Sequence, residues 1–185
     1  MLRILCTGNP NIPGIAKELQ QTYPNTKFIS RSSGYDLLSP EGLEKFSSII
    51  SKFNIFINHS QLIPDGQLTL LSIAAEKMQN GKIINIGSVL EFDQWSWIEP
   101  AAAEIKKELK ELSLSLNSET LKTTHITVGG LKSTDEDHMR LDPADVVTTI
   151  KWIIESKLDI PHLYIDNTSE ELKEYWLAKK KDYQQ

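Results

Sequence analysis

The N-terminal stretch from Met1 to Gly14 (MLRILCTGNPNIPG) constrains the fold of this chain more than any other part of the sequence. Its apolar run from Leu2 to Cys6, interrupted only by Arg3, has the length and residue types of a buried β-strand. The residues from Thr7 to Asn11 break that strand into a turn, and apolar residues at helical spacing follow Gly14. A strand, a glycine-containing turn and a helix in this order predict the first unit of a nucleotide-binding sheet. In such a unit the N–H groups that start the helix face a pyrophosphate.

The glycines of this turn fit a phosphate-binding pattern only in part. Gly8 and Gly14 stand at the first and third glycine positions of Thr-Gly-x-x-x-Gly-x-Gly, and Ile12 stands at the middle one. Asn9, directly after the first glycine, belongs to the same turn. An ordinary turn between a strand and a helix has the same appearance, so this motif alone leaves both interpretations open.

Composition narrows the class of protein. A formal net charge of −5 argues against nucleic acid or an anionic membrane as the main partner. No apolar run is long enough to span a membrane, and the N-terminus lacks the pattern of a signal peptide. Cys6 is the only cysteine, which excludes an internal disulfide and a thiolate metal cluster. We therefore expect one domain, residues 1–185, in a cytoplasmic protein.

Strand and helix patterns alternate along the chain. The expected strands are Leu2–Cys6, Asn25–Ser30, Asn54–Asn58, Lys82–Gly87, Thr123–Val128 and Leu163–Ile165. The expected helices follow Gly14, Ser39, Gly66, Glu99 and Asp142, and a charged helix ends the chain. This alternation predicts an α/β fold with a doubly wound, mostly parallel six-stranded sheet of Rossmann type and helices on both faces. Ligands of such sheets bind at the carboxyl ends of the strands.

Several segments at these strand ends carry recognisable residue patterns. In chain order they are Thr7-Gly8 to Gly14, Arg31-Ser32, Asp36-Leu37, Ile57-Asn58-His59-Ser60-Gln61, the run Gly81 to Val89 that contains Ser88, and Val128-Gly129-Gly130 with the later Thr134. Together, in this order and spacing, they resemble the short-chain dehydrogenase/reductase family over nearly the whole chain.

The resemblance implies a nicotinamide dinucleotide along this edge of the sheet. It places Gly8, Asn9 and Gly14 at the pyrophosphate, Asp36 and Leu37 beside the adenine, and Asn58, Gly130 and Thr134 along the cofactor. Arg31, with Ser32 as a helper, stands where the family selects NADP by pairing with its 2′-phosphate. A solvated surface arginine is the plain alternative. NADP is thus the expected cofactor, with NAD the less favoured one, and no metal is expected.

Two departures from the family pattern matter. The usual helix and strand after the second strand are missing, which leaves six strands. The catalytic Tyr-x-x-x-Lys is also broken, because the leucine register of the helix after Glu99 puts Lys106 on the Lys position and Ala102 on the Tyr position. The resemblance then leaves Ser88 to bind the substrate oxygen and Lys106 to bind the nicotinamide ribose. Lys106 also fits a charged helix face, as does the neighbouring Lys107.

The missing tyrosine keeps several functions open. One is an NADP-binding oxidoreductase that acts on a small carbonyl or hydroxyl compound of unknown identity. Another is an inactive dinucleotide-binding pseudoenzyme that serves as a sensor or subunit. A third has no nucleotide, with Ile12 filling the turn. His59 is either a proton donor or simply a hydrogen-bonded residue at the strand end. The resemblance also implies a homodimer or homotetramer through the helices Leu68–Met78 and Pro100–Leu116.

Overall fold

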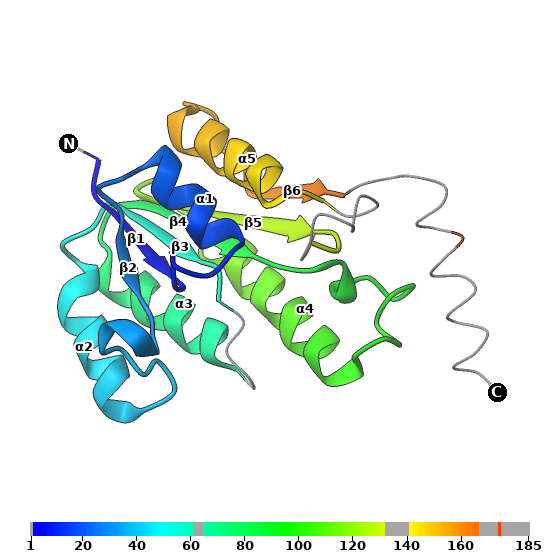
Figure 1. The fold of residues 1–185 in the computed structure, drawn as a ribbon, viewed down its shortest axis with the longest axis horizontal. Helices are drawn as coiled ribbons and strands as arrows, with labels where there is room; N and C mark the ends of the chain where they lie inside the picture. The colour runs from blue at the N-terminus through cyan, green and yellow to red at the C-terminus, as the bar shows by residue number, and fades with distance from the viewer. Residues whose placement is uncertain (1, 61–64, 132–140, 167–173, 175–185) are drawn as a thin grey trace.

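The computed structural model describes residues 2–60, 65–131, 141–166 and 174, and within them a single parallel sheet forms the centre (Figure 1). Its order is β2-β1-β3-β4-β5-β6, and every neighbouring pair is parallel. The strands are β1 (Ile4–Thr7), β2 (Lys27–Ile29), β3 (Ile55–Asn58), β4 (Gly81–Ile86), β5 (Leu121–Val128) and β6 (His162–Ile165). The predicted α/β fold with a six-stranded sheet is confirmed.

Helices cover both faces of the sheet (Figure 1). They are α1 (Ile15–Thr22), α2 (Pro40–Ile50), α3 (Gly66–Lys77), α4 (Pro100–Ser115) and α5 (Pro143–Glu155), with short 3₁₀ turns η1 (Arg31–Ser33) and η2 (Val89–Glu91). One apolar cluster packs α1 and α5 on one face, and a second packs α2, α3 and α4 on the other. Because helices cover both faces, the inner strands β1 and β3 are completely buried and carry apolar side chains on both sides.

Helix starts follow the sequence signals, whereas strand boundaries shift by a few residues. Ser39 caps α2 by accepting a hydrogen bond from the Gly42 N–H at 3.0 Å, and Asp142 caps α5 through the Ala144 N–H at 2.9 Å. The fifth strand begins at Leu121 rather than Thr123, because Leu121 already pairs with Gly81 of β4. The second strand is shorter than predicted. The predicted C-terminal helix lies outside the described residues.

The strand order places a topological switch point between β1 and β3. The chain leaves β1 through α1 toward β2, and returns across α2 to β3 on the other side of β1. Connections on opposite faces separate at such a point, which opens a crevice at the carboxyl ends of these two strands. The strand order therefore predicts a ligand site at the carboxyl ends of β1 and β3.

Candidate functional site

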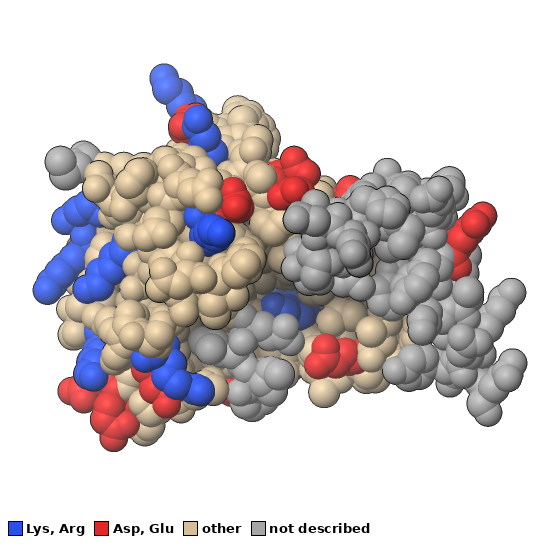
Figure 2. Space-filling model, viewed as in Figure 1, with Lys and Arg blue, Asp and Glu red and all other residues tan. Residues whose placement is uncertain are grey.

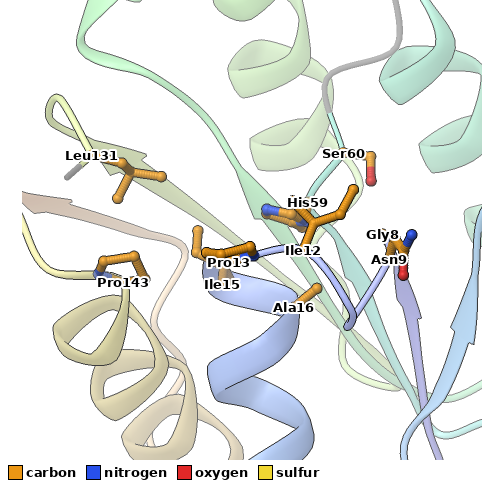
Figure 3. A pocket seen from close by; sticks show the side chains of 11 residues that line it. Gly8, Asn9, Ile12, Pro13, Ile15, Ala16, His59, Ser60, Leu131 and Pro143 are labelled. Carbon is orange, nitrogen blue, oxygen red and sulfur yellow. The ribbon is translucent and has the colours of Figure 1, made fainter. Parts of the chain in front are cut away.

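A pocket of about 570 Å³ lies at this switch point (Figure 3). Its walls come from the turn after β1, the start of α1, the segment after β3, the segment after β5 and the first residue of α5. The lining residues are Gly8, Asn9, Ile12, Pro13, Gly14, Ile15, Ala16, His59, Ser60, Leu131 and Pro143. Three residues predicted to bind the cofactor, Gly8, Asn9 and Gly14, thus share one pocket.

The backbone of the turn requires glycine at two positions. Gly8 has φ +131° and Gly14 has φ +136°, both in the region that side-chain-bearing residues rarely adopt. At Gly8 a Cβ atom would lie 3.1 Å from His59 Nδ1 and 3.2 Å from Ala16 Cβ. At Gly14, which precedes α1, a Cβ atom would meet nothing within 4 Å. The backbone at the start of α1 is therefore open to the pocket, and the first N–H groups of a helix have no partner inside it.

Ile12 stands in this pocket rather than in the core. The residue is 60% exposed, and its N–H donates to the Asn9 carbonyl at 3.2 Å. The Asn9 side chain closes the turn further, because its Oδ1 accepts from the Asn11 N–H at 3.0 Å. The residue at the middle glycine position is thus an apolar part of the pocket wall, next to Pro13 (Figure 3).

His59 also lines the pocket, and Thr7 holds it in place. The His59 N–H donates to Thr7 Oγ1 at 2.8 Å, and the ring Nδ1 donates to the Thr7 carbonyl at 3.2 Å. Burial lowers the pKa of the imidazole, the bond to Thr7 opposes that shift, and the charge of Lys106 lowers the pKa further. His59 is therefore neutral near pH 7, with Nδ1 protonated and Nε2 left as an acceptor.

Strand β2, the turn after it and helix α2 carry exposed cations. In Figure 2, Lys and Arg side chains gather along one edge of the molecule, at the left of the view, over β2 and α2. Lys27, Arg31 and Lys45 are exposed members of this part of the chain. The Arg31 side chain is 78% exposed and its Nε lies 3.7 Å from Asp36 Oδ1. A pair so exposed contributes little to stability, so Arg31 is available to an anion.

The other residues predicted on the adenine side divide between surface and core. Ser32 is exposed, and its Oγ lies 2.8 Å from Ser30 Oγ. Leu37, in contrast, is buried in the apolar cluster under α2 and α3. Asn58 is also fully buried, and its Nδ2 donates to the Gln67 carbonyl at 2.8 Å and to Asn85 Oδ1 at 3.0 Å. Leu37 and Asn58 are therefore buried supports of this edge of the sheet rather than exposed groups.

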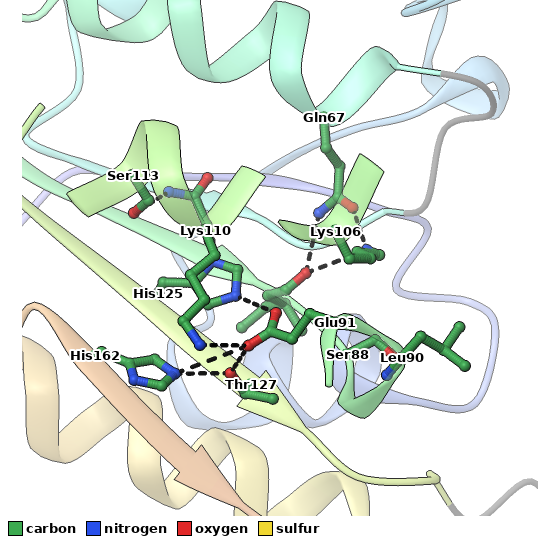
Figure 4. Close-up of polar contacts among 12 residues, drawn as sticks. Gln67, Ser88, Leu90, Glu91, Lys106, Lys110, Ser113, His125, Thr127 and His162 are labelled. Atoms are coloured by element: carbon green, nitrogen blue, oxygen red, sulfur yellow. Dashed lines mark hydrogen bonds and ion pairs between the residues drawn. The ribbon is translucent and has the colours of Figure 1, made fainter. Parts of the chain in front are cut away.

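The predicted catalytic residues lie at the carboxyl end of β4 (Figure 4). Ser88 precedes η2 and its Oγ accepts from the Leu90 N–H at 3.3 Å. Lys106 reaches the same strand end from α4, because its Nζ donates to the Ile86 carbonyl at 3.5 Å. Gly130, predicted along the cofactor, lies after β5 and accepts from the Leu141 N–H at 2.9 Å. Thr134 lies outside the described residues.

Gln67 holds the Lys106 amine and was not predicted. Lys106 Nζ donates to Gln67 Oε1 at 2.5 Å, and Gln67 Nε2 donates to the carbonyls of Asn58 at 2.9 Å and Ile86 at 3.2 Å. The amide thus joins the ends of β3 and β4 and presents its oxygen to the amine (Figure 4). Burial of Lys106 lowers its pKa to about 8.

Glu91, at the end of η2, forms a second buried polar cluster that was also not predicted. Its carboxylate is completely buried and accepts from His125 Nε2 at 2.8 Å and from Thr127 Oγ1 (Figure 4). Lys110 Nζ lies 3.3 Å away and His162 Nε2 3.9 Å away. Burial acts to raise the pKa of Glu91, but these hydrogen bonds and charges outweigh it and hold the pKa below its usual value.

The described residues limit what other chemistry this edge can perform. Among them no group of three or more His, Cys, Asp or Glu side chains is arranged to hold a metal ion. None of the helices in the described part of the chain could cross a membrane. Burial also raises the pKa of the Cys6 thiol far above its usual value, so this cysteine is an inert part of β1.

Comparisons with known proteins support the fold through structure alone. No protein-family model and no curated protein sequence matches the chain. Solved structures do match. A glucose/ribitol short-chain dehydrogenase/reductase from Brucella melitensis has a TM-score of 0.67 at 14% identity, over 88% of this chain and 94% of that chain. The 3α-hydroxysteroid dehydrogenase from Pseudomonas sp. B-0831, solved with NADH, has a TM-score of 0.66 at 12% identity, over 93% and 98%.

A third match, the ligand-free glucose dehydrogenase of Caenorhabditis elegans, has a TM-score of 0.67 at 14% identity, over 88% of this chain and 95% of that chain. The chain therefore has the Rossmann-type fold of the short-chain dehydrogenases/reductases. The resemblance predicted from the sequence is confirmed at the level of the fold.

Proposed function

We propose that the protein binds a nicotinamide dinucleotide, NADP in preference to NAD, and reduces or oxidises a small carbonyl or hydroxyl compound. The observation that carries this proposal is the pocket at the switch point, with Gly8 and Gly14 in its wall and the start of α1 facing it. A pyrophosphate fits such a place because the helix N-terminus favours its charge and the glycines let its oxygens approach the backbone.

The residues present suit the cofactor along the rest of the edge. Gly8, Asn9 and Gly14 would hold the pyrophosphate, and Arg31 with Ser32 would meet a 2′-phosphate. When bound, the nicotinamide ring supplies or accepts the hydride. The chain's own part is to hold the substrate oxygen, and we assign this part to Ser88, whose hydroxyl lies at the end of β4.

An inactive dinucleotide-binding protein is the second candidate, favoured by one observation. Ala102, which takes the tyrosine position, provides no proton donor. A general acid or base contributes roughly 10² to 10⁴ in rate, so its loss alone would remove most turnover of an unactivated substrate. Turnover of an activated diketone such as diacetyl with NADPH separates the two candidates.

Binding is tested by titration of the full chain with NADPH and NADH. We expect NADPH to bind more tightly, and Arg31→Ala to remove the difference, because Arg31 is the exposed cation at the end of β2. Each tenfold difference in affinity between NADPH and NADH corresponds to about 1.4 kcal/mol of binding free energy. Lys52→Ala, at a basic residue that follows α2, is the matched control and should keep the preference.

Equal affinities for NADPH and NADH in the unaltered protein would refute the role of Arg31. Failure of both to bind would refute the proposed function and favour a pocket that takes no dinucleotide.

Self-association through α3 and α4 is part of the same proposal. Both helices lie on one face of the sheet, and Ala101 and Ala102 at the start of α4 are small enough for close approach of a second helix. A two-fold axis would pair each helix with its copy. Sedimentation at micromolar concentration should show a dimer or tetramer, and a monomer alone would contradict this expectation.

A further inference from the structure

The proposed oxidoreductase needs a proton donor near Ser88. Two amines reach this strand end among the described residues: Lys110 pairs with the Glu91 carboxylate, whereas Lys106 contacts the neutral oxygens of Gln67 and Ile86. We propose that Lys106, held by Gln67, is itself the group that gives its proton to the substrate oxygen during reduction and takes it back during oxidation. This inference rests on the proposed function. It gives the remaining N–H of Lys106 to the substrate oxygen, where the resemblance had given it to the cofactor ribose.

The geometry places the amine at the correct strand end. Lys106 Nζ is bound to the carbonyl of Ile86, and Ser88 follows Ile86 by two residues. Ala102 precedes Lys106 by one helical turn on α4, so only a methyl group stands where the resemblance places a phenol. The amine also lies close enough to the pocket for its charge to lower the pKa of His59, a residue of the pocket wall.

One N–H of the Lys106 ammonium has no partner among the described residues. An ammonium group has three N–H donors, and the contacts within the described residues use two of them, toward Gln67 Oε1 and the Ile86 carbonyl. Both acceptors are neutral, and no carboxylate is in hydrogen-bond contact with Nζ in the described part of the chain. The proton is therefore fixed in position without an anion that would bind it permanently.

The charges around Lys106 suit proton exchange near neutral pH. Burial lowers the pKa of the amine to about 8, while Glu91 from η2 and Glu99 at the start of α4 act in the opposite direction. His59, the titratable group on the β3 side, is neutral. A donor works best when its pKa lies near the working pH, because it is then mostly protonated and still gives up its proton readily.

The step balances with the groups named. In reduction a hydride from the nicotinamide forms the new C–H bond, and the carbonyl π pair becomes a lone pair on oxygen. That oxygen takes the proton from Lys106 Nζ as the N–H bond breaks, which leaves a neutral amine. A proton from water then restores the ammonium. The net reaction joins a ketone, NADPH and a proton to give an alcohol and NADP.

The first test measures the proton directly, without cofactor or turnover. The pKa of Lys106 is read from the pH dependence of its Cε–Hε NMR signal, assigned by the loss of that signal in Lys106→Met. We expect titration near 8, whereas Lys107, an exposed neighbour on the same helix, titrates above the usual 10.5 because Asp93 bonds its amine. A Lys106 signal that titrates near 10.5 would overturn the inference.

The second test measures the pH profile of diacetyl reduction with saturating NADPH. The rate should follow the ammonium form, so it is constant below about 8 and falls about tenfold per pH unit above it. Gln67→Glu keeps Lys106 but places a carboxylate at its amine, which raises the pKa of Lys106 and should move the fall to higher pH. A lysine that served only to support the fold would leave the profile unmoved.

Substitution of the lysine completes the test. Lys106→Arg keeps the charge and the donors but cannot release a proton, so it should bind NADPH and lose at least about 100-fold in rate. Lys107→Met, the matched control, should keep both the affinity for NADPH and the rate of reduction. Full turnover in Lys106→Arg, or an unshifted profile in Gln67→Glu, would overturn the inference. NADPH binding without any turnover in the unaltered protein would also overturn it, whereas the absence of NADPH binding would refute the proposed function.

Discussion

The two halves of the sheet's carboxyl edge are built differently. At the ends of β1 and β3 the surface is mostly backbone, shaped by Gly8 and Gly14 and open to a pocket. At the ends of β4 and β5 the surface rests on buried polar side chains that bind one another, with Glu91 and Lys106 as the two charged centres (Figure 4). The first half can accept a ligand as it stands. In the second half most of the buried polar groups bind one another, although His125 Nδ1 and one N–H of Lys106 have no partner among the described residues.

This difference separates binding from chemistry. Backbone N–H groups at a helix start can bind an anion wherever the turn has the right φ values and leaves enough space. Few residues therefore determine this binding. Proton transfer needs a particular side chain at a particular distance, so a single substitution can remove it. The two halves should therefore respond differently to substitution.

The largest effect should follow the loss of the carboxylate at the centre of the β4–β5 half. Glu91→Ala leaves His125, Thr127 and Lys110 without their common acceptor in a buried place. Removal of one partner from a buried charged network costs about 3–5 kcal/mol of the free energy of unfolding. Urea denaturation followed by circular dichroism would measure this loss.

A matched control separates burial from charge. Glu104 also pairs with a lysine, because its Oε1 lies 3.4 Å from Lys107 Nζ, but its side chain is 71% exposed. Glu104→Ala should change the free energy of unfolding by less than about 1 kcal/mol. A similar small loss in Glu91→Ala would mean that the cluster does not hold the β4–β5 half together.

The sequence predicted those features that depend on local pattern. The alternation of apolar strands and amphipathic helices gave the order of elements, and Gly8 and Gly14 marked the turn, because both signals reside in neighbouring residues. The leucine register of α4 also placed Lys106 correctly on the inner face, since a helical period fixes which side chains face the sheet.

Features that depend on distant partners were not predicted. Gln67, on α3, meets Lys106 from α4, and the sequence separation of these residues hides the contact. Glu91 lies in η2, and its partners His125 and Thr127 lie on β5, more than 30 residues further along the chain. The signal that pointed to them was present but unspecific: β5 is buried along most of its length yet carries polar residues such as Thr123, His125 and Thr127, and buried polar groups require partners.

The smallest effect concerns Ile12 and tests the β1–β3 half alone. Ile12 is 60% exposed in the pocket wall, so its replacement should not change stability. Ile12→Glu and Ile12→Gln have nearly the same shape, and only the first adds a negative charge beside the proposed pyrophosphate. We expect Ile12→Glu to bind NADPH about tenfold more weakly than Ile12→Gln, because two like charges a few ångströms apart near a surface repel by about 1–4 kcal/mol. Titration at low and at high salt would measure the difference, which should shrink at high salt because ions screen the repulsion. Equal affinities of the two variants at low salt would mean that the phosphates do not lie at this turn.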